Sequence, residues 1–329
     1  MSYVFILIIF LLLVGCQEDD VFLPEIEEVL VNREEADWRK KQNVWIYKQM
    51  NHNYFWTDQL KDSIDYDYSL PPSLFFENML VPEDRFSYCQ PYDGYKPPVR
   101  SIDMNETISL DSVYTYSEMK VGYFVYGEFG TEADVTDVVL KFNRTRIDEL
   151  IVDLRDNPGG YVSTCQYLAS LIAPVDCLGN LFVTCRFNRF LSEEYFQKTG
   201  SSVTELFFKD DYLTFVRNLN LRRVLFLVNG HSASCSELLV NSLRPYMKVV
   251  VIGETTVGKD VGMRRISGPR YMYELWPITF RTYNAAGDSI PTTGIVPDIY
   301  IEDIEDYPLG DVNEIMLKTA LDYLTQAAG

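Results

Sequence analysis

The chain has 329 residues, enough for one large or two modest domains, and its composition, 47% hydrophobic and 14% aromatic, supports a substantial buried core. Its net charge of −19 is spread along the chain, which argues against nucleic acid as a partner because nucleic-acid binding needs a basic surface. With only two histidines and no H-E-x-x-H motif, a metal-dependent hydrolase is disfavoured, and no metal or cofactor is expected.

Residues 1–16 have the pattern of a lipoprotein signal peptide. An apolar run of about 12 residues is too short to span a bilayer, and it ends in Leu13-Val14-Gly15-Cys16. This ending resembles a bacterial lipobox, which implies lipidation of Cys16 and attachment to a membrane through that lipid. The acidic Gln17-Glu18-Asp19-Asp20 resembles the export signal of surface lipoproteins. We therefore expect an outer-membrane lipoprotein of the bacterial cell envelope, and the acidic stretch is compatible with exposure at the cell surface. An ordinary membrane-anchoring helix is the alternative to the signal peptide.

The next segments predict a tether, a small helical domain and a linker. Residues 17–33 are acidic and lack a clear period, as expected of a tether. Aromatic and apolar residues then recur with helical spacing from Glu34 to Trp56, and we expect an N-terminal helical domain over 34–87 that buries them in its own core. A ligand-binding surface is the less favoured interpretation. Clusters of Pro, Gly and Asp predict a linker or loop region, with room for one strand, over 88–120.

From residue 121 to 329, apolar strands alternate with helices, which indicates an α/β core domain whose sheet is buried on both faces. The predicted strands are 121–126, 150–154, 223–228 and 249–252, with one or two antiparallel strands over 271–283. The predicted helices are 134–145, from the glycine turn to Ile172, from about Ser236, and from a capping box at 311–314 to about Gln326. A long insert over 186–222 is placed to cap a cleft.

Ser234 is the candidate nucleophile. It lies where a buried strand gives way to a helix, and the positive end of the helix dipole there favours a developing oxyanion. Because Ser234 and Glu237 also have the spacing of a capping box, helix capping is the alternative explanation.

Lys259 is the candidate general base. It lies 25 residues after Ser234, in the segment that follows an apolar strand, and comes directly after Gly258. A lysine, with an ordinary pKa of about 10.4, can accept a proton at neutral pH only if burial lowers that pKa. A lysine in an exposed loop is the alternative.

Two backbone amides are candidates for the oxyanion hole. The amide of Cys235 adjoins the nucleophile, and Gly160 ends the turn Pro158-Gly159-Gly160, where the missing side chain lets the backbone approach a substrate. The same glycines also suit a tight connection between a strand and a helix.

Three motifs in this order resemble those of the C-terminal processing, or tail-specific, peptidases, a family of Ser-Lys serine endopeptidases. They are D-L-R-x-N-x-G-G at 153–160, S-A-S-x-S-E at 232–237 and G-x-x-T-x-G-K at 253–259. The resemblance implies Ser234 as nucleophile, Lys259 as base, and the amides of Gly160 and Cys235 as the oxyanion hole. It further implies a crotonase-like, ClpP-like core, a polypeptide substrate and an acyl-enzyme intermediate. The G-I-x-P-D element at 294–298 resembles a closing element of the family that serves packing.

The sequence departs from the family pattern at two places. Several members carry a polar residue, often Gln, four positions after the lysine to orient it, whereas this chain has Met263, so another group must hold the amine. The family also usually carries a PDZ domain between the helical region and the core. The stretch between Ser87 and Val121 is well below the minimum of about 50 residues for a domain, so we expect no PDZ domain here.

Two other functions compete with the peptidase. A thiol hydrolase built on Cys235 and His231 is disfavoured, because residues four apart at a strand–turn–helix junction do not readily face one substrate, and no orienting partner is evident. The second is a catalytically inactive lipoprotein that binds a peptide or another ligand on the same fold, which Met263 suggests. Besides Cys16 there are five cysteines, which cannot all pair with one another; in an exported protein Cys177 and Cys185 could pair across a short loop.

Overall fold

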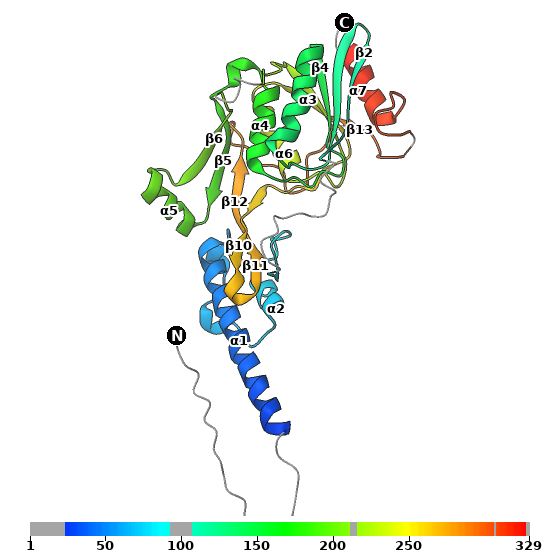
Figure 1. Cartoon of the computed structure of the whole chain (residues 1–329). Coiled ribbons are helices and arrows are strands. Elements are labelled where there is room, and N and C mark those ends of the chain that lie inside the picture. The colour runs from blue at the N-terminus through cyan, green and yellow to red at the C-terminus, as the bar shows by residue number, and fades with distance from the viewer. Residues whose placement is uncertain (1–23, 93–106, 211–215, 306, 327–329) are drawn as a thin grey trace, which may run out of the picture.

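The computed structural model describes residues 24–92, 107–210, 216–305 and 307–326, with the backbone alone for 24–32 (Figure 1). The helices are α1 Pro24–Asn53, α2 Pro72–Glu77, α3 Glu132–Thr145, α4 Val162–Ile172, α5 Arg189–Thr199, α6 Cys235–Leu243 and α7 Ile315–Gln326. The strands are β1 Tyr88–Pro91, β2 Ile108–Tyr116, β3 Met119–Tyr126, β4 Glu149–Asp153, β5 Leu181–Phe187, β6 Val203–Phe207, β7 Arg223–Val228, β8 Lys248–Gly253, β9 Val261–Met263, β10 Ile266–Gly268, β11 Tyr273–Trp276, β12 Ile278–Tyr283 and β13 Ile299–Tyr300. The predicted signal peptide and its Cys16 lie outside the described residues.

The core is a six-stranded sheet in the order β13-β8-β7-β4-β3-β2, parallel except for β2, which runs antiparallel to β3. Successive side chains of β3 enter different apolar clusters. Phe124 belongs to the cluster shared with α3, α4 and α6, and Tyr123 to the cluster shared with α7. Burial on both faces explains why these strands are continuous apolar runs. The α/β core predicted from the sequence is therefore confirmed.

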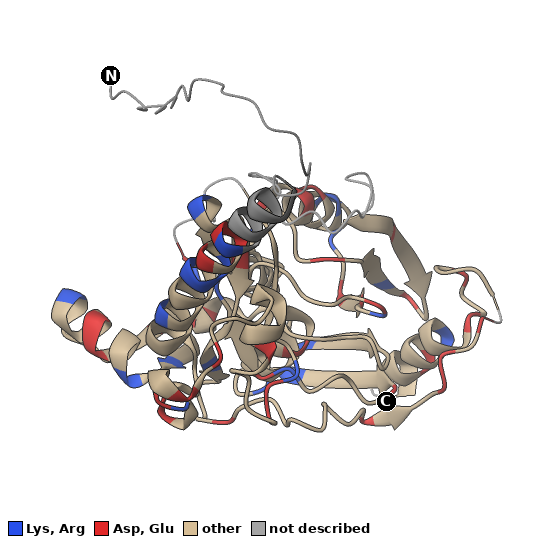
Figure 2. Ribbon diagram, turned by 90° about the horizontal axis from the view of Figure 1, so that it is seen from below, with Lys and Arg blue, Asp and Glu red and all other residues tan. Residues whose placement is uncertain are grey.

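The N-terminal domain packs around the three-stranded sheet β1-β11-β10. Its core joins Ile46 of α1, Tyr54 directly after that helix and Phe75 of α2 to Leu275 of β11, a strand from the far end of the chain. Ile46 and Tyr54 are buried here, and Trp45 and Trp56 pack against this cluster, as predicted, whereas Trp38 is 39% exposed. The helix begins at Pro24, so residues 24–33, expected to belong to a tether, extend α1 instead. Acidic and basic residues are interspersed along this helix (Figure 2).

The insert over 186–222 forms part of a four-stranded antiparallel sheet in the order β6-β5-β12-β9. It contributes α5 and β6, which project from the core together with the end of β5 (Figure 1). The side chain of Asn188 accepts a hydrogen bond from Leu191 at the start of α5 and donates to the carbonyl oxygens of His52 and Tyr54. The base of the insert is thereby fixed to the end of α1.

Two expectations about element boundaries were wrong. The region 88–120 holds two strands, β1 and β2, and β2 adds an edge strand to the core sheet. The last helix begins at Ile315, after the expected capping box at 311–314, because the Glu314 carboxylate itself accepts the amide of Leu317 at 2.8 Å. None of the helices within the described ranges is both long enough and apolar enough to cross a bilayer.

Candidate active site

Ser234 occupies the turn between β7 and α6, at the carboxyl end of a central strand. Its φ of 57° and ψ of −111° are unfavourable for a residue with a side chain, and such strain persists only where the surroundings enforce it. The turn is fixed by the Ala233 amide, which donates to the Asn157 carbonyl at 3.0 Å, and by the Ser232 hydroxyl, which donates to the Leu154 carbonyl at 2.7 Å. Ser234 itself is half-buried, so part of it stays accessible.

The glycine turn packs against the start of α6. A Cβ on Gly159, whose φ is +107°, would lie 2.7 Å from the Ser234 Cβ and 2.9 Å from the Cys235 nitrogen. A Cβ on Gly160, whose φ is +145°, would lie 2.3 Å from the Phe129 carbonyl oxygen. Both positions require glycine. The structure thus brings the segments that carry the two expected oxyanion amides, Gly160 and Cys235, into contact beside Ser234.

Glu237, fully buried in the first turn of α6, connects Ser234 to the loop over residues 254–260 that carries Lys259, called the lysine loop below. Its Oε2 accepts the amides of Ser234 at 2.9 Å and Lys259 at 2.8 Å. Its Oε1 accepts the Gly258 amide at 2.7 Å and the Thr256 hydroxyl at 2.5 Å. The carboxylate thus supports the helix start, as the capping pattern predicts, and also fixes the loop, so capping does not exclude a catalytic serine.

The closing element at 294–298 packs against the lysine loop. Gly258 has a φ of +81°, and a Cβ there would lie 2.3 Å from the Thr292 carbonyl oxygen. Gly294 has a φ of +96°, and a Cβ there would lie 2.0 Å from the Thr256 carbonyl oxygen. Only glycine permits this close approach of two backbones. The element therefore has the packing role that the sequence indicated.

Ser234 and Lys259 line the same small cavity, with a volume of about 20 Å³. Its other walls are mostly apolar side chains: Val162, Leu238, Val261, Phe280 and Ile290, with Cys235, Gly262 and Thr282. The cavity lies between the start of α6 and the strands β9 and β12. The ring of Phe280 on β12 occupies the space that a side chain at Gly262 on β9 would need. The two residues predicted to act together are thus at one site with an apolar wall.

Several groups surround the lysine loop. Met263 lies in β9, paired with Ile278, where the family pattern suggests a polar residue. Asp260, next to Lys259 in sequence, is buried; burial raises its pKa, and the Arg281 guanidinium, 2.7 Å away, partly offsets that effect. The Phe86 ring from the N-terminal domain lies 5.2 Å from the Lys259 Nζ. Phe86 could not be found from the sequence, because no local pattern marks a contact between segments so far apart in the chain.

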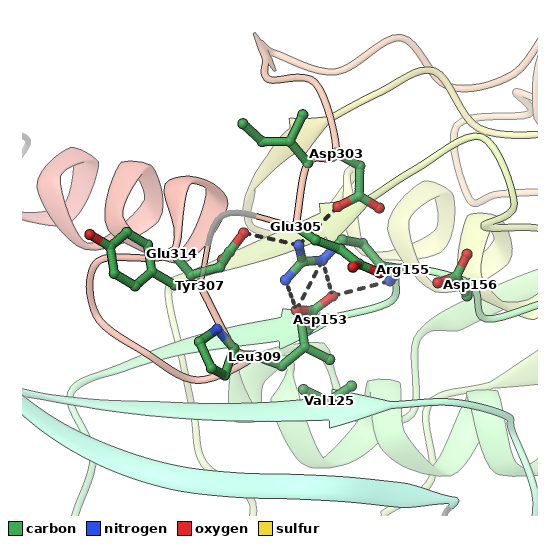
Figure 3. Close-up of a pocket in the computed structure, with 11 residues that line it drawn as sticks. Val125, Asp153, Arg155, Asp156, Asp303, Glu305, Tyr307, Leu309 and Glu314 are labelled. Carbon is green, nitrogen blue, oxygen red and sulfur yellow. Dashed lines mark hydrogen bonds and ion pairs between the residues drawn. The ribbon is translucent and has the colours of Figure 1, made fainter.

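A second, larger cavity of about 520 Å³ lies at the carboxyl ends of β3 and β4 (Figure 3). Its buried Arg155 donates hydrogen bonds to Asp153, Asp303 and Glu314. Burial alone would lower the pKa of Arg155, but Asp153 and Glu314 outweigh it and raise that pKa above its usual range. Arg155, which belongs to the D-L-R-x-N-x-G-G motif, therefore links β4 to the start of α7 through its ion pairs with Asp153 and Glu314. Within the described ranges, no group of three or more His, Cys, Asp or Glu side chains is arranged to hold a metal.

The residues of the competing thiol hydrolase have other partners. The Cys235 thiol is buried and donates to the Gly160 carbonyl at 3.2 Å. The exposed His231 ring lies with its Nδ1 2.9 Å from Asp156 Oδ1. All five cysteines of the described residues are free, so the considered pair of Cys177 and Cys185 is not bonded here.

Comparisons with known proteins agree on one family. Residues 120–301 match the model of peptidase family S41, and residues 41–88 match the peptidase S41 N-terminal domain. The chain is 28% identical over 158 residues to "Probable CtpA-like serine protease" of Staphylococcus aureus (strain N315), covering 47% of this chain and 28% of that protein. It is 26% identical over 244 residues to "Carboxyl-terminal-processing protease" of Picosynechococcus sp., an alignment that covers 69% of this chain and 52% of that protein. The chain thus spans about half or less of the length of these relatives.

Among solved structures, one assigned to the S41 proteases of Bacteroides fragilis superposes with a TM-score of 0.73 at 21% identity, covering 86% of this chain and 97% of that one. A lipoprotein of Streptococcus agalactiae superposes with a TM-score of 0.58 at 12% identity, covering 88% and 96%. At these identities the likeness concerns the fold. It agrees with the expected α/β core and N-terminal helical domain.

Proposed function

Because the chain belongs to peptidase family S41, we propose that it is a serine endopeptidase that cleaves exported or extracellular polypeptides with a Ser234–Lys259 dyad. The observation that carries this proposal is the shared cavity of the two residues, together with the Glu237 carboxylate that holds both of their backbones. A nucleophile and its base must be held at a fixed distance and orientation. The Glu237 carboxylate contributes to this by binding the backbone amides of both residues.

In the proposed reaction, Ser234 Oγ attacks the carbonyl carbon of the peptide bond while its proton passes to the neutral Lys259 amine. The amides of Cys235 and Gly160 stabilise the resulting oxyanion. The Lys259 ammonium then gives its proton to the leaving nitrogen, and the C–N bond breaks. A water molecule, deprotonated by the same amine, attacks the acyl-enzyme and releases the second product.

The apolar wall of the cavity supports a preference for substrates with a small apolar side chain beside the cleaved bond. About 20 Å³ of free space between Leu238, Val261 and Phe280 leaves little room for a large group and offers few polar partners. The substrate is therefore expected to carry a small, uncharged side chain at the residue that enters this cavity. We further propose that the protein is attached to the outer membrane through Cys16; the lipobox pattern is the support for this assignment.

The dyad is tested by comparing wild type with Ser234→Ala and Lys259→Ala on casein and on fluorogenic peptides. Each substitution should lower kcat/KM by at least about 10³-fold, because nucleophile and base act as a unit. Lys198→Ala is the matched control, since Lys198 is an exposed lysine on α5. A fluorophosphonate probe should label wild type and leave Ser234→Ala unlabelled. Equal cleavage by all variants would contradict the dyad, and peptide binding without cleavage by wild type would indicate the inactive relative.

A further inference from the structure

The N-terminal domain places a rigid turn directly beside the lysine loop of the core. The Asp84 amide donates to the Val81 carbonyl at 3.0 Å, and the Asp84 carboxylate accepts the amides of Phe86 at 3.0 Å and Ser87 at 2.8 Å. The Ser87 hydroxyl in turn accepts the amide of Ile278 on β12 at 2.8 Å. The turn is thus closed on itself and bonded to β12 of the four-stranded sheet, so its side chains have a defined direction.

Arg85 in this turn donates hydrogen bonds to the backbone of the lysine loop and to the backbone of the segment packed against that loop. Its Nη2 lies 2.8 Å from the Gly258 carbonyl oxygen and 3.1 Å from that of Thr292. These bonds join the residue before Lys259 to the segment that packs against it. A guanidinium that donates to two carbonyl oxygens fixes their relative position.

The Phe86 ring contacts two cations, the Arg85 guanidinium, whose Cζ lies 4.8 Å from the ring centroid, and the Lys259 amine. The Lys259 Nζ lies 5.2 Å from the ring centroid, inside the roughly 6 Å range within which an aromatic face attracts a cation. Such a contact favours the ammonium over the amine by about 2–5-fold in equilibrium. It also limits the directions that a flexible lysine side chain can take. Met263, at the position where the family pattern suggests a polar orienting residue, offers an amine only the weak acceptor of a thioether sulfur.

We propose that Phe86 is a positioning residue for Lys259, and that the N-terminal domain thereby completes the active site of the core. This inference rests on the proposed role of Lys259 as the base. When the Ser234 hydroxyl proton moves to Lys259, the neutral amine becomes an ammonium beneath the ring. The ring stabilises that ammonium, and Arg85 holds the loop on which it is carried.

The test compares Phe86→Leu, which keeps an apolar side chain without the ring, with Phe86→Tyr, which keeps the ring. In Phe86→Leu we expect a kcat reduced by about 2–5-fold on the alkaline plateau of the pH–rate profile, an unchanged KM, and an acid limb of that profile displaced to lower pH by about half a unit. Phe86→Tyr should retain the wild-type profile. The control Phe196→Leu, an exposed phenylalanine on α5, should change neither rate nor profile.

Other outcomes of the same experiment would overturn the proposal. A raised KM with unchanged kcat would make Phe86 a substrate contact. A lower melting temperature with an unmoved pH profile would make it a packing residue alone.

A second measurement separates this proposal from the proposed function. In a double-mutant cycle of Phe86→Leu and Lys259→Met, followed by urea unfolding of the full chain, the two substitutions should couple at low pH, and the coupling should weaken as the pH rises, because the ring attracts the ammonium and not the neutral amine. Coupling in a protein without peptidase activity would preserve the contact and overturn the proposed function. Additive effects at every pH, in an active enzyme, would overturn the contact and leave the dyad intact.

Discussion

The Glu237 carboxylate accepts the backbone amide of Lys259 at 2.8 Å, and the same oxygen accepts the amide of Ser234 at 2.9 Å. One buried side chain therefore sets the separation between the turn that carries the nucleophile and the loop that carries its base. The other carboxylate oxygen of Glu237 accepts the Gly258 amide and the Thr256 hydroxyl. Both oxygens are therefore used as acceptors of hydrogen bonds from the protein.

Substitution of Glu237 by Gln should damage both stability and catalysis. A glutamine keeps one acceptor oxygen, but its NH₂ group would face two donors that then have no acceptor. Unsatisfied buried donors cost about 1–3 kcal/mol each. We expect a free energy of unfolding lower by about 2 kcal/mol or more, measured by urea denaturation, and a lower kcat on a peptide substrate. Glu193→Gln, on the exposed surface of α5, is the control; equal behaviour of the two variants would contradict this role.

Gly159→Ala should displace the nucleophile. The added methyl group would lie 2.7 Å from the Ser234 Cβ, so either the glycine turn or the serine must move. Loss of alignment with one oxyanion donor typically reduces the rate by about 10²–10³-fold, and we expect a fall in kcat of that order. The control is Gly179→Ala, which has a similarly positive φ of +79° but no atom within 4 Å. It shares the backbone strain without the contact. A kcat that falls equally in both variants would show that strain, and not displacement of Ser234, is responsible.

Much of the core could be predicted because its strands are buried on both faces. The predicted strand at 223–228 coincides with β7, and the motifs at its end locate the segments that meet beside Ser234. By contrast, β2 is half-exposed and carries Asp111 and Ser112, so its sequence lacks the apolar run of a buried strand. It is held by its pairing with β3, which only the folded chain reveals.

The parts of the site that the sequence did not reveal depend on contacts between distant segments. Phe86 meets Lys259 where the N-terminal domain, whose sheet includes β11 from the far end of the chain, packs against the lysine loop. The start of α7 was misplaced for a similar reason. Both Asp311 and Glu314 are residues that can cap a helix, and the bond between Glu314 and Arg155 fixes the carboxylate that caps Leu317.

Arg155→Met should be one of the more destabilising single substitutions in the core. It would leave the buried carboxylates of Asp153 and Glu314 without their cation, and breaking a buried ion pair in this way typically costs about 3–5 kcal/mol. Urea unfolding should show this loss. Arg222→Met is the control, because its ion pair with Asp176 is exposed and should contribute little. If the Arg155 variant unfolds at the wild-type urea concentration, the cluster does not secure α7 to the sheet.

Glu274 should make the N-terminal sheet sensitive to acid. Burial alone would raise its pKa, but hydrogen bonds from Arg265, Gln90 and Trp276 outweigh burial and lower that pKa below its ordinary value of 4.5. The folded state therefore prefers the carboxylate, and its contribution to stability is present above pH 4.5 and is lost as the pH falls through the lowered pKa.

Glu274→Gln should accordingly be less stable than wild type at pH 7, by about 1–3 kcal/mol. The difference between the two proteins should shrink as the pH falls below 4.5, because the wild-type carboxylate then takes up a proton. Urea denaturation of both proteins at about pH 7, 4.5 and 3 measures this difference in the free energy of unfolding. Glu205→Gln, an exposed position on β6, controls for the loss of one negative charge. A stability difference that stays constant over this range would mean that the Glu274 carboxylate is not favoured by its three donors.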